Sequence, residues 1–113
     1  MNNYEKTTEK LRELGIRPNI SGYIYLREAI LMVADDPLLI NVVTKEIYPT
    51  VASKFEKTPS QIERAMRHAI EVAWKRQSEQ MIKMFKNLSY GRKPDNSLFI
   101  ALLAEDIRMD SNV

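Results

Sequence analysis

The chain has 113 residues, which fits a single domain, since domains usually have about 100–200 residues. It contains no cysteine, which excludes disulfides and thiolate metal sites and leads us to expect a cytoplasmic protein. The net charge of +2 is unevenly distributed, because residues 44–95 contain eleven basic and six acidic side chains while both flanking segments are net acidic. A basic central segment suits a surface that faces a polyanion. No apolar run approaches the roughly 20 residues of a membrane helix, so we expect no membrane contact.

Helix signals recur along the chain, and strand-like alternation is absent. The first predicted helix covers about residues 4–14, because Gly15 suits the left-handed position after a helix and Pro18 prevents its continuation. Ser21 is a suitable N-cap for a second helix, which we expect to end near Ala34.

The next segment contains two proline signals. Asp36 followed by Pro37 predicts the start of a further helix that extends through Val43, because proline at the first helical position loses no hydrogen bond. The stretch from Thr44 to Phe55 also has a helical pattern, but Pro49 lies within it. Either the helix bends at this proline or a new helix starts there, and the pattern allows both.

The clearest predicted helix covers residues 59–76. Thr58 and Gln61 form a capping box around Pro59, and no glycine or proline interrupts the following residues. Ser78 is expected to cap a short helix that reaches Leu88, and a polar loop then leads to a last helix over about residues 97–108. The expected fold is therefore all-α, with about six helices in one domain over residues 1–113.

The helix over residues 59–76 has two distinct faces. Its apolar positions form one stripe: Ile62, Met66, Ala69, Ile70 and Ala73. The opposite side collects Ser60, Arg64, Arg67, His68, Glu71 and Lys75. A short amphipathic segment at about residues 49–55 precedes it, so the pair follows the plan of a helix-turn-helix over about residues 44–76. Arginine on such a helix can contact guanine in the major groove of double-stranded DNA.

Other interpretations of these residues exist. Arg64, Arg67 and Lys75 could form an ordinary solvated helix face, which is the usual role of charged positions. His68 is the only histidine, so it has no partners for a metal site and would contact phosphate or solvent. Trp74 lies at the edge of the apolar stripe and suits the core better than a stacking platform.

Several segments resemble the effector domain of the sporulation master response regulator, the stage-zero sporulation transcription factor of endospore-forming Firmicutes. The similar segments are 22–30, Thr44-Lys45, Tyr48-Pro49, Ala52, 62–74, Lys93-Pro94, Asn96-Ser97 and 99–101. The run Ile-Glu-Arg-Ala-Met-Arg-His-Ala-Ile-Glu-Val-Ala-Trp at 62–74 is close to the recognition helix of that family. Together these segments span nearly the whole chain.

The resemblance implies a six-helix domain that binds TGTCGAA-type promoter elements of double-stranded DNA, often as tandem dimers, and acts on transcription through RNA polymerase. By position, Glu63 and Arg64 correspond to the base-contacting pair, while Arg67 and His68 lie near the DNA backbone. Ser60 and Lys75, on the same face, are expected to contact the backbone as well. Gln61 either contacts a base or caps the helix, because its one amide serves both roles.

The sequence departs from the family in three respects. Gln61 stands where the family commonly has arginine, and the stretch between Trp74 and Pro94 is shorter, which puts the polymerase-contacting surface in doubt. We find no phosphoacceptor receiver domain in the sequence and therefore expect DNA binding to be constitutive. The chain is expected to be either an excised effector domain or a stand-alone relative, and the sequence allows both.

An alternative function is a protein-interaction domain that acts as an antagonist or partner of a full-length regulator. The apolar residues of the last helix suggest it: Leu98, Phe99, Ala101, Leu102 and Leu103. An enzyme is not expected, because the carboxylates Glu63 and Glu71 have no accompanying nucleophile, metal cluster or phosphate-binding loop. We therefore expect no cofactor and no metal ion.

Overall fold

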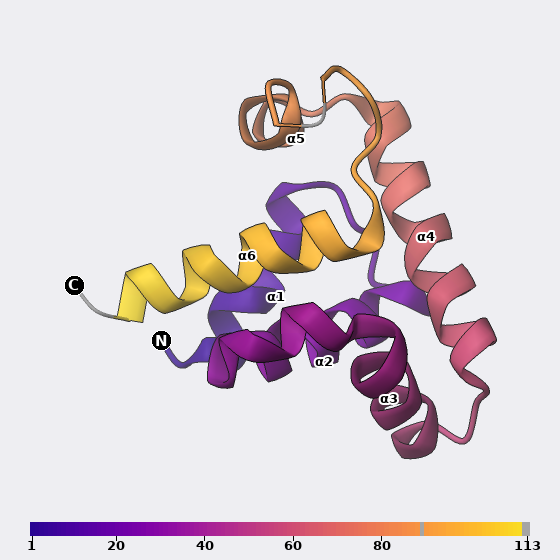
Figure 1. Ribbon diagram of the computed structural model, residues 1–113. Helices are drawn as coiled ribbons and strands as arrows, with labels where there is room; N and C mark the ends of the chain where they lie inside the picture. The colour runs from indigo at the N-terminus through magenta and orange to yellow at the C-terminus, as the bar shows by residue number, and fades with distance from the viewer. Residues whose placement is uncertain (89, 112–113) are drawn as a thin grey trace.

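The computed structural model describes residues 1–88 and 90–111, and in these residues it contains helices and no strand. The α-helices are α1 (Asn3–Glu13), α2 (Gly22–Asp35), α3 (Tyr48–Lys54), α4 (Pro59–Arg76), α5 (Glu79–Phe85) and α6 (Asn96–Ser111) (Figure 1). A 3₁₀ helix, η1 (Pro37–Val42), and a π-helix, η2 (Val43–Ile47), connect α2 to α3. The predicted all-α class with six α-helices is confirmed.

Three of the predicted helix starts are formed by the expected side chains. The Asp36 carboxylate accepts a hydrogen bond from the Leu38 amide at 3.3 Å. The Ser78 hydroxyl accepts one from the Met81 amide at 3.2 Å. The capping box of α4 is complete, and its hydrogen bonds are described with the site below. These starts were predictable because a cap depends on a few adjacent residues.

Other local expectations were met only in part. Ser21 occupies the N-cap position of α2 as expected, but it has helical backbone angles, φ −54° and ψ −33°, and its side chain makes no capping hydrogen bond. The last helix starts at Asn96 instead of Ser97, because the Asp95 carboxylate accepts from the Leu98 amide at 2.8 Å and so caps one residue earlier. Leu88 lies beyond the end of α5 and is exposed.

The two alternatives for Pro49 are resolved by the 3₁₀ and π segments. A new α-helix starts at Tyr48, which places Pro49 in its first turn, where the missing N–H costs no intrahelical hydrogen bond. The residues before it form the wide turns of the π-helix η2, a rare conformation that often occurs at functional sites.

The core forms around α2, which packs against α1, α3, α4 and α6. The predicted stripe of α4 is buried as expected, and burying each large apolar side chain such as Ile62 or Ile70 stabilises the fold by about 1.5–3 kcal/mol. At Gly22, a Cβ atom would lie 2.2 Å from the main-chain oxygen of Ala65 and 2.7 Å from the Cβ of Ala69. The absence of a side chain at Gly22 therefore allows α2 and α4 to cross in close contact.

Helix α6 crosses the domain and contributes most of its apolar side to the core (Figure 1). Phe99 and Leu103 are fully buried, and the Phe99 ring stacks on Phe85 with ring centroids 5.5 Å apart. Leu98 and Leu102 are partly buried against the same core. Most of this apolar cluster therefore packs against the core, which leaves little of it for the partner surface of the alternative function. None of the helices in the described ranges is long and apolar enough to cross a membrane.

Candidate nucleic-acid interface

Helices α3 and α4 pack against each other and are joined by residues 55–58 (Figure 1). Glu56 ends α3 in a left-handed conformation with φ 56°, and the Lys57 amide donates to the Ala52 carbonyl at 2.9 Å. This is the hydrogen bond of a Schellman motif, which closes the helix end and reverses the chain. Thr58 then starts α4, so the connection is short and locally determined.

The exposed face of α4 carries the residues that were expected to contact DNA. Six of them are exposed: Ser60, Gln61, Arg64, Arg67, His68 and Lys75. Glu63 is partly buried on the flank of this face. The structure therefore places six of the seven predicted site residues on the solvent-exposed side of α4, and Glu63 on the flank between this side and the buried stripe.

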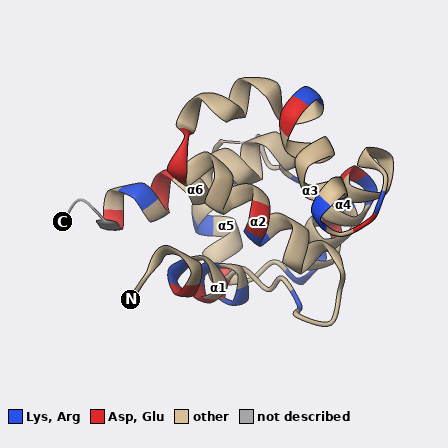
Figure 2. Cartoon of the chain, turned by 90° about the horizontal axis from the view of Figure 1, so that it is seen from below, with Lys and Arg blue, Asp and Glu red and all other residues tan. Residues whose placement is uncertain are grey.

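Each acidic side chain on this face is paired with a cation. The Nε atom of Arg67 lies 3.1 Å from Oε1 of Glu63, one helical turn away. Glu71 lies 3.5 Å from the ammonium of Lys75 and 3.9 Å from that of Lys93. Figure 2 shows acidic and basic segments side by side on α4. This pairing reduces the repulsion that carboxylates would exert on a polyanion.

Two side chains of the exposed α4 face, Arg64 and His68, do not pair with its carboxylates. Within the described ranges, Arg64 and His68 have no ion pair and no side-chain hydrogen bond in the structure. Arg64 thus keeps the five N–H donors of its guanidinium for a ligand, in the fork geometry that suits guanine O6 and N7.

Gln61 takes part in the capping box. Its side-chain Oε1 atom accepts from the main-chain N–H of Thr58 at 2.9 Å, while the main-chain N–H of Gln61 donates to the Thr58 hydroxyl at 3.1 Å. A bidentate contact with adenine needs both the oxygen and the nitrogen of the side-chain amide. The capping bond occupies the oxygen, so the two roles compete for the same atom.

Asn96, at the start of α6, connects three elements at the centre of the interface. Its buried side-chain nitrogen donates to the Tyr48 hydroxyl at 3.0 Å and to the main-chain oxygen of Glu63 at 3.1 Å. Burial raises the pKa of the Tyr48 phenol above its ordinary value, and the hydrogen bond from Asn96 opposes this shift. The first residues of α3 and α6 thereby fix the position of α4 beside Glu63.

A furrow runs along the side of α4, formed by two adjoining hollows of about 380 and 270 Å³ that share Tyr48, Glu63 and Arg67. We call it the α4 furrow. The first hollow is also lined by Thr44, Pro59, Ser60 and Arg64. The second is also lined by Lys93, Asp95, Asn96 and Ser97.

Four residues of the furrow were not predicted as site residues from the sequence: Thr44, Tyr48, Lys93 and Ser97. The four belong to segments that carry the family resemblance, which was the available signal. A helical wheel treats one helix at a time and cannot place residues from three other segments beside it.

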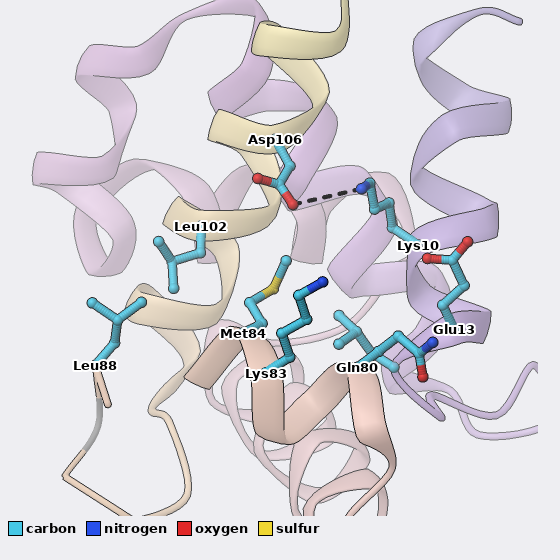
Figure 3. Close-up of a pocket in the computed structure, with 9 residues that line it drawn as sticks. Lys10, Glu13, Gln80, Lys83, Met84, Leu88, Leu102 and Asp106 are labelled. Atoms are coloured by element: carbon cyan, nitrogen blue, oxygen red, sulfur yellow. Dashed lines mark ion pairs between the residues drawn. The ribbon is translucent and has the colours of Figure 1, made fainter. Parts of the chain in front are cut away.

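A separate cavity of about 450 Å³ lies between α1, α5 and α6. Its wall includes apolar Met84, Leu88 and Leu102, and its rim carries charged side chains, among them Lys83 and the ion pair of Lys10 with Asp106 at 3.6 Å (Figure 3). It shares no lining residue with the α4 furrow. The lining includes no pair of a nucleophile and a base, so it does not suggest catalysis.

The family model described as the C-terminal domain of the sporulation initiation factor Spo0A matches residues 7–107. The match covers α2, α3, α4 and α5 completely and most of α1 and α6. It includes all the residues of the exposed α4 face and of the furrow.

Proposed function

The chain belongs to the family of Spo0A C-terminal domains, which are DNA-binding effector domains of transcription regulators, and on this premise we propose that it recognises TGTCGAA-type promoter elements through the exposed face of α4. The observation that carries this proposal is Arg64, whose exposed guanidinium is unpaired within the described ranges and lies on the face opposite the buried stripe. A helix of this kind fits the major groove, where arginine distinguishes guanine from the other bases.

The proposed base contacts are those of Arg64 and Glu63. Arg64 would donate two hydrogen bonds to guanine, and a carboxylate such as Glu63 can accept a hydrogen bond from the amino group of cytosine. Gln61 would contribute a further base contact only when its oxygen leaves the Thr58 amide. Otherwise Gln61 would continue to cap the start of α4 through its hydrogen bond with the Thr58 amide.

The proposed backbone contacts surround these positions on the same face. They are Ser60, Arg67, His68 and Lys75. Such contacts set the affinity and orientation of the domain on the duplex without selecting a sequence. Arg67 has a double role in this arrangement, because it also neutralises Glu63.

We further propose that the domain acts in the cytoplasm, that two copies pair only on tandem DNA elements, and that the bound domain contacts RNA polymerase. Exposed large apolar side chains on the described surface are spread over separate elements, for example Tyr4 on α1, Leu38 on η1 and Met109 on α6. This distribution supports a monomer off DNA. Sedimentation that gives a stable dimer at micromolar concentration without DNA would contradict the pairing proposal.

The test of the proposed function is the affinity of the wild type and of Arg64→Ala for a TGTCGAA duplex and a scrambled duplex, each over a series of salt concentrations. We expect the wild type to prefer the specific duplex. Arg64→Ala should lose about 1–3 kcal/mol on that duplex and discriminate less at one guanine. An equal loss on both duplexes would make Arg64 a phosphate contact, and a wild type without preference would refute sequence-specific binding. The salt series is necessary because phosphate contacts dominate non-specific binding at low salt.

A further inference from the structure

We propose that the α4 furrow holds the sugar–phosphate backbone of one DNA strand, with Thr44, Lys93 and Ser97 as contacts in addition to those on α4. The inference rests on the proposed function, since it takes α4 as the helix in the major groove. It extends the interface from one helix to a cleft with two walls. The ligand is the backbone of the same duplex whose bases α4 contacts.

The two walls of the furrow come from separate parts of the chain. Helix α4 supplies one wall through Ser60, Glu63 and Arg67. The opposite wall consists of Thr44 in η2 and of Lys93 and Ser97 on either side of the α6 start. Because the backbones of both strands border the major groove, a cleft beside a helix in that groove faces one of them.

The second wall is held parallel to α4 at two points. Asn96 is hydrogen-bonded to the main chain of Glu63, and Lys93 is paired with Glu71. Residues 63 and 71 are separated by about 12 Å along a helix, and the three-residue step from 93 to 96 spans about 10 Å when extended. The wall therefore follows α4 over about 10 Å, which is long enough for more than one phosphate of a strand whose nucleotides rise by 3.4 Å each along the duplex axis.

The side chains that line the furrow can supply the donors that phosphates need. Thr44 and Ser97 are exposed hydroxyls, and Lys93 and Arg67 are cations. The Tyr48 hydroxyl oxygen accepts from Asn96, so its own hydrogen is left to be donated.

Two carboxylates also line the furrow, and both are already engaged. Glu63 is paired with Arg67, and Asp95 accepts from the Leu98 amide at the start of α6. Arg67 and Lys93 are themselves paired with Glu63 and Glu71, but a guanidinium has five N–H donors and an ammonium three, so donors remain for a ligand. A phosphate backbone matches this set better than a cation or an apolar segment would.

The test is a map of single phosphate contacts. Individual phosphates of the specific duplex are replaced one at a time by neutral methylphosphonates, and the affinity of each duplex is measured for the wild type, Lys93→Ala and Lys83→Ala. Lys83→Ala is the matched control, because it removes the same charge from the cavity between α1, α5 and α6. Circular dichroism establishes that both variants are folded.

We expect two or three adjacent phosphates on one strand to weaken wild-type binding several-fold when they are neutralised. Lys93→Ala should remove the penalty at one of them and reduce the salt dependence of binding by about 0.9 in the logarithmic slope, whereas Lys83→Ala should change neither. The double variant Thr44→Val/Ser97→Ala should remove the penalty at other phosphates of the same strand and leave base preference unchanged.

The results distinguish a failure of the furrow proposal from a failure of the proposed function. If the wild type prefers the specific duplex but Lys93→Ala and the double variant keep every wild-type penalty, the furrow does not hold the backbone. If the wild type has no preference for the specific duplex, the failure lies with the proposed function. Should Lys93→Ala not fold, Lys93→Gln and the double variant provide the same comparison.

Discussion

The guanidinium of Arg67 and the carboxylate of Glu63 form an ion pair across one turn of α4, with Nε lying 3.1 Å from Oε1 and 3.3 Å from Oε2. Arg67 is exposed and Glu63 is partly exposed, and solvent-accessible pairs of this spacing stabilise a helix by only about 0.3–0.5 kcal/mol. The pair therefore has little effect on folding. Its main consequence is that the charge of Glu63 is compensated at the position where we propose a base contact.

Arg67→Ala should weaken binding to specific and scrambled duplexes alike and lower the salt slope by about one, because a phosphate contact is lost in both cases. Its free energy of unfolding should change by less than about 0.5 kcal/mol. Fluorescence anisotropy across a salt series measures the first effect, and urea unfolding measures the second. A loss confined to the specific duplex would instead assign Arg67 to a base. Arg67→Ala also leaves the Glu63 carboxylate without its partner, so the same change made in a Glu63→Gln background isolates the phosphate contact.

Gly22→Ala should destabilise the domain by about 1–3 kcal/mol or more, because the added methyl group would overlap the main chain of α4 at Ala65. The relief of this overlap requires α4 to move away from α2, so affinity for DNA should fall as well. Urea unfolding and DNA titration of the same preparation measure both effects. Ser21→Ala is the matched control, since Ser21 is exposed and makes no capping hydrogen bond, and its cost should stay within about 0.5 kcal/mol. A Gly22→Ala variant as stable as Ser21→Ala would contradict the close crossing.

Tyr48 should make the stability of the domain depend on pH in the alkaline range. Its pKa is raised in the folded state by burial, so the unfolded chain releases the phenolic proton first as pH rises. The stabilisation is complete below the unfolded value of about 10 and is lost as pH rises from there through the folded pKa.

The measurement compares the wild type with Tyr48→Phe by urea unfolding at pH 9 and pH 11. At pH 9 the variant should be less stable by about 1 kcal/mol, because Asn96 loses one acceptor. Between the two pH values the wild type should lose more stability than the variant, and the other titrating groups cancel in this comparison. Equal losses would show that Tyr48 does not titrate differently in the two states.

Whether a prediction from the sequence was correct depended largely on how far apart in the chain the interacting residues lie. The α4 capping box depends on Thr58 and Gln61 alone, so the pattern predicted it correctly. Ser21 has the right residue type for a cap, but the preceding residues already turn, and no capping bond forms. The π-helix before α3 leaves no local signal that distinguishes it from an α-helix. Asn96 could not be placed because its partner Tyr48 lies 48 positions away in the chain.

The same distinction applies to the site. A wheel of α4 was sufficient to group its exposed residues, because they belong to one regular element. The opposite wall of the furrow required the tertiary arrangement, since Thr44 and Lys93 come from segments on either side of α4 in the sequence. These residues were visible as similarities to the family but had no assigned position relative to the helix.

The role of Gln61 decides whether this domain differs from its family in base preference. The side-chain oxygen accepts from the Thr58 amide at 2.9 Å, which completes the capping box without DNA. We therefore expect capping to be its role. Gln61→Ala should cost up to about 1 kcal/mol of stability and leave the preferred DNA sequence unchanged.

Two further variants separate capping from base contact. Gln61→Glu keeps an oxygen for the Thr58 amide, as glutamate also occupies this position of the capping box, but it removes the amide donor that adenine N7 requires. Gln61→Arg restores the residue that is common in the family. If Gln61 only caps, Gln61→Glu should be as stable as the wild type, and selection of binding sites from random duplexes should give the same sequence for the wild type, Gln61→Ala and Gln61→Glu. If Gln61 contacts a base instead, the wild type should select adenine at one flanking position, Gln61→Ala and Gln61→Glu should lose this preference, and Gln61→Arg should shift it toward guanine.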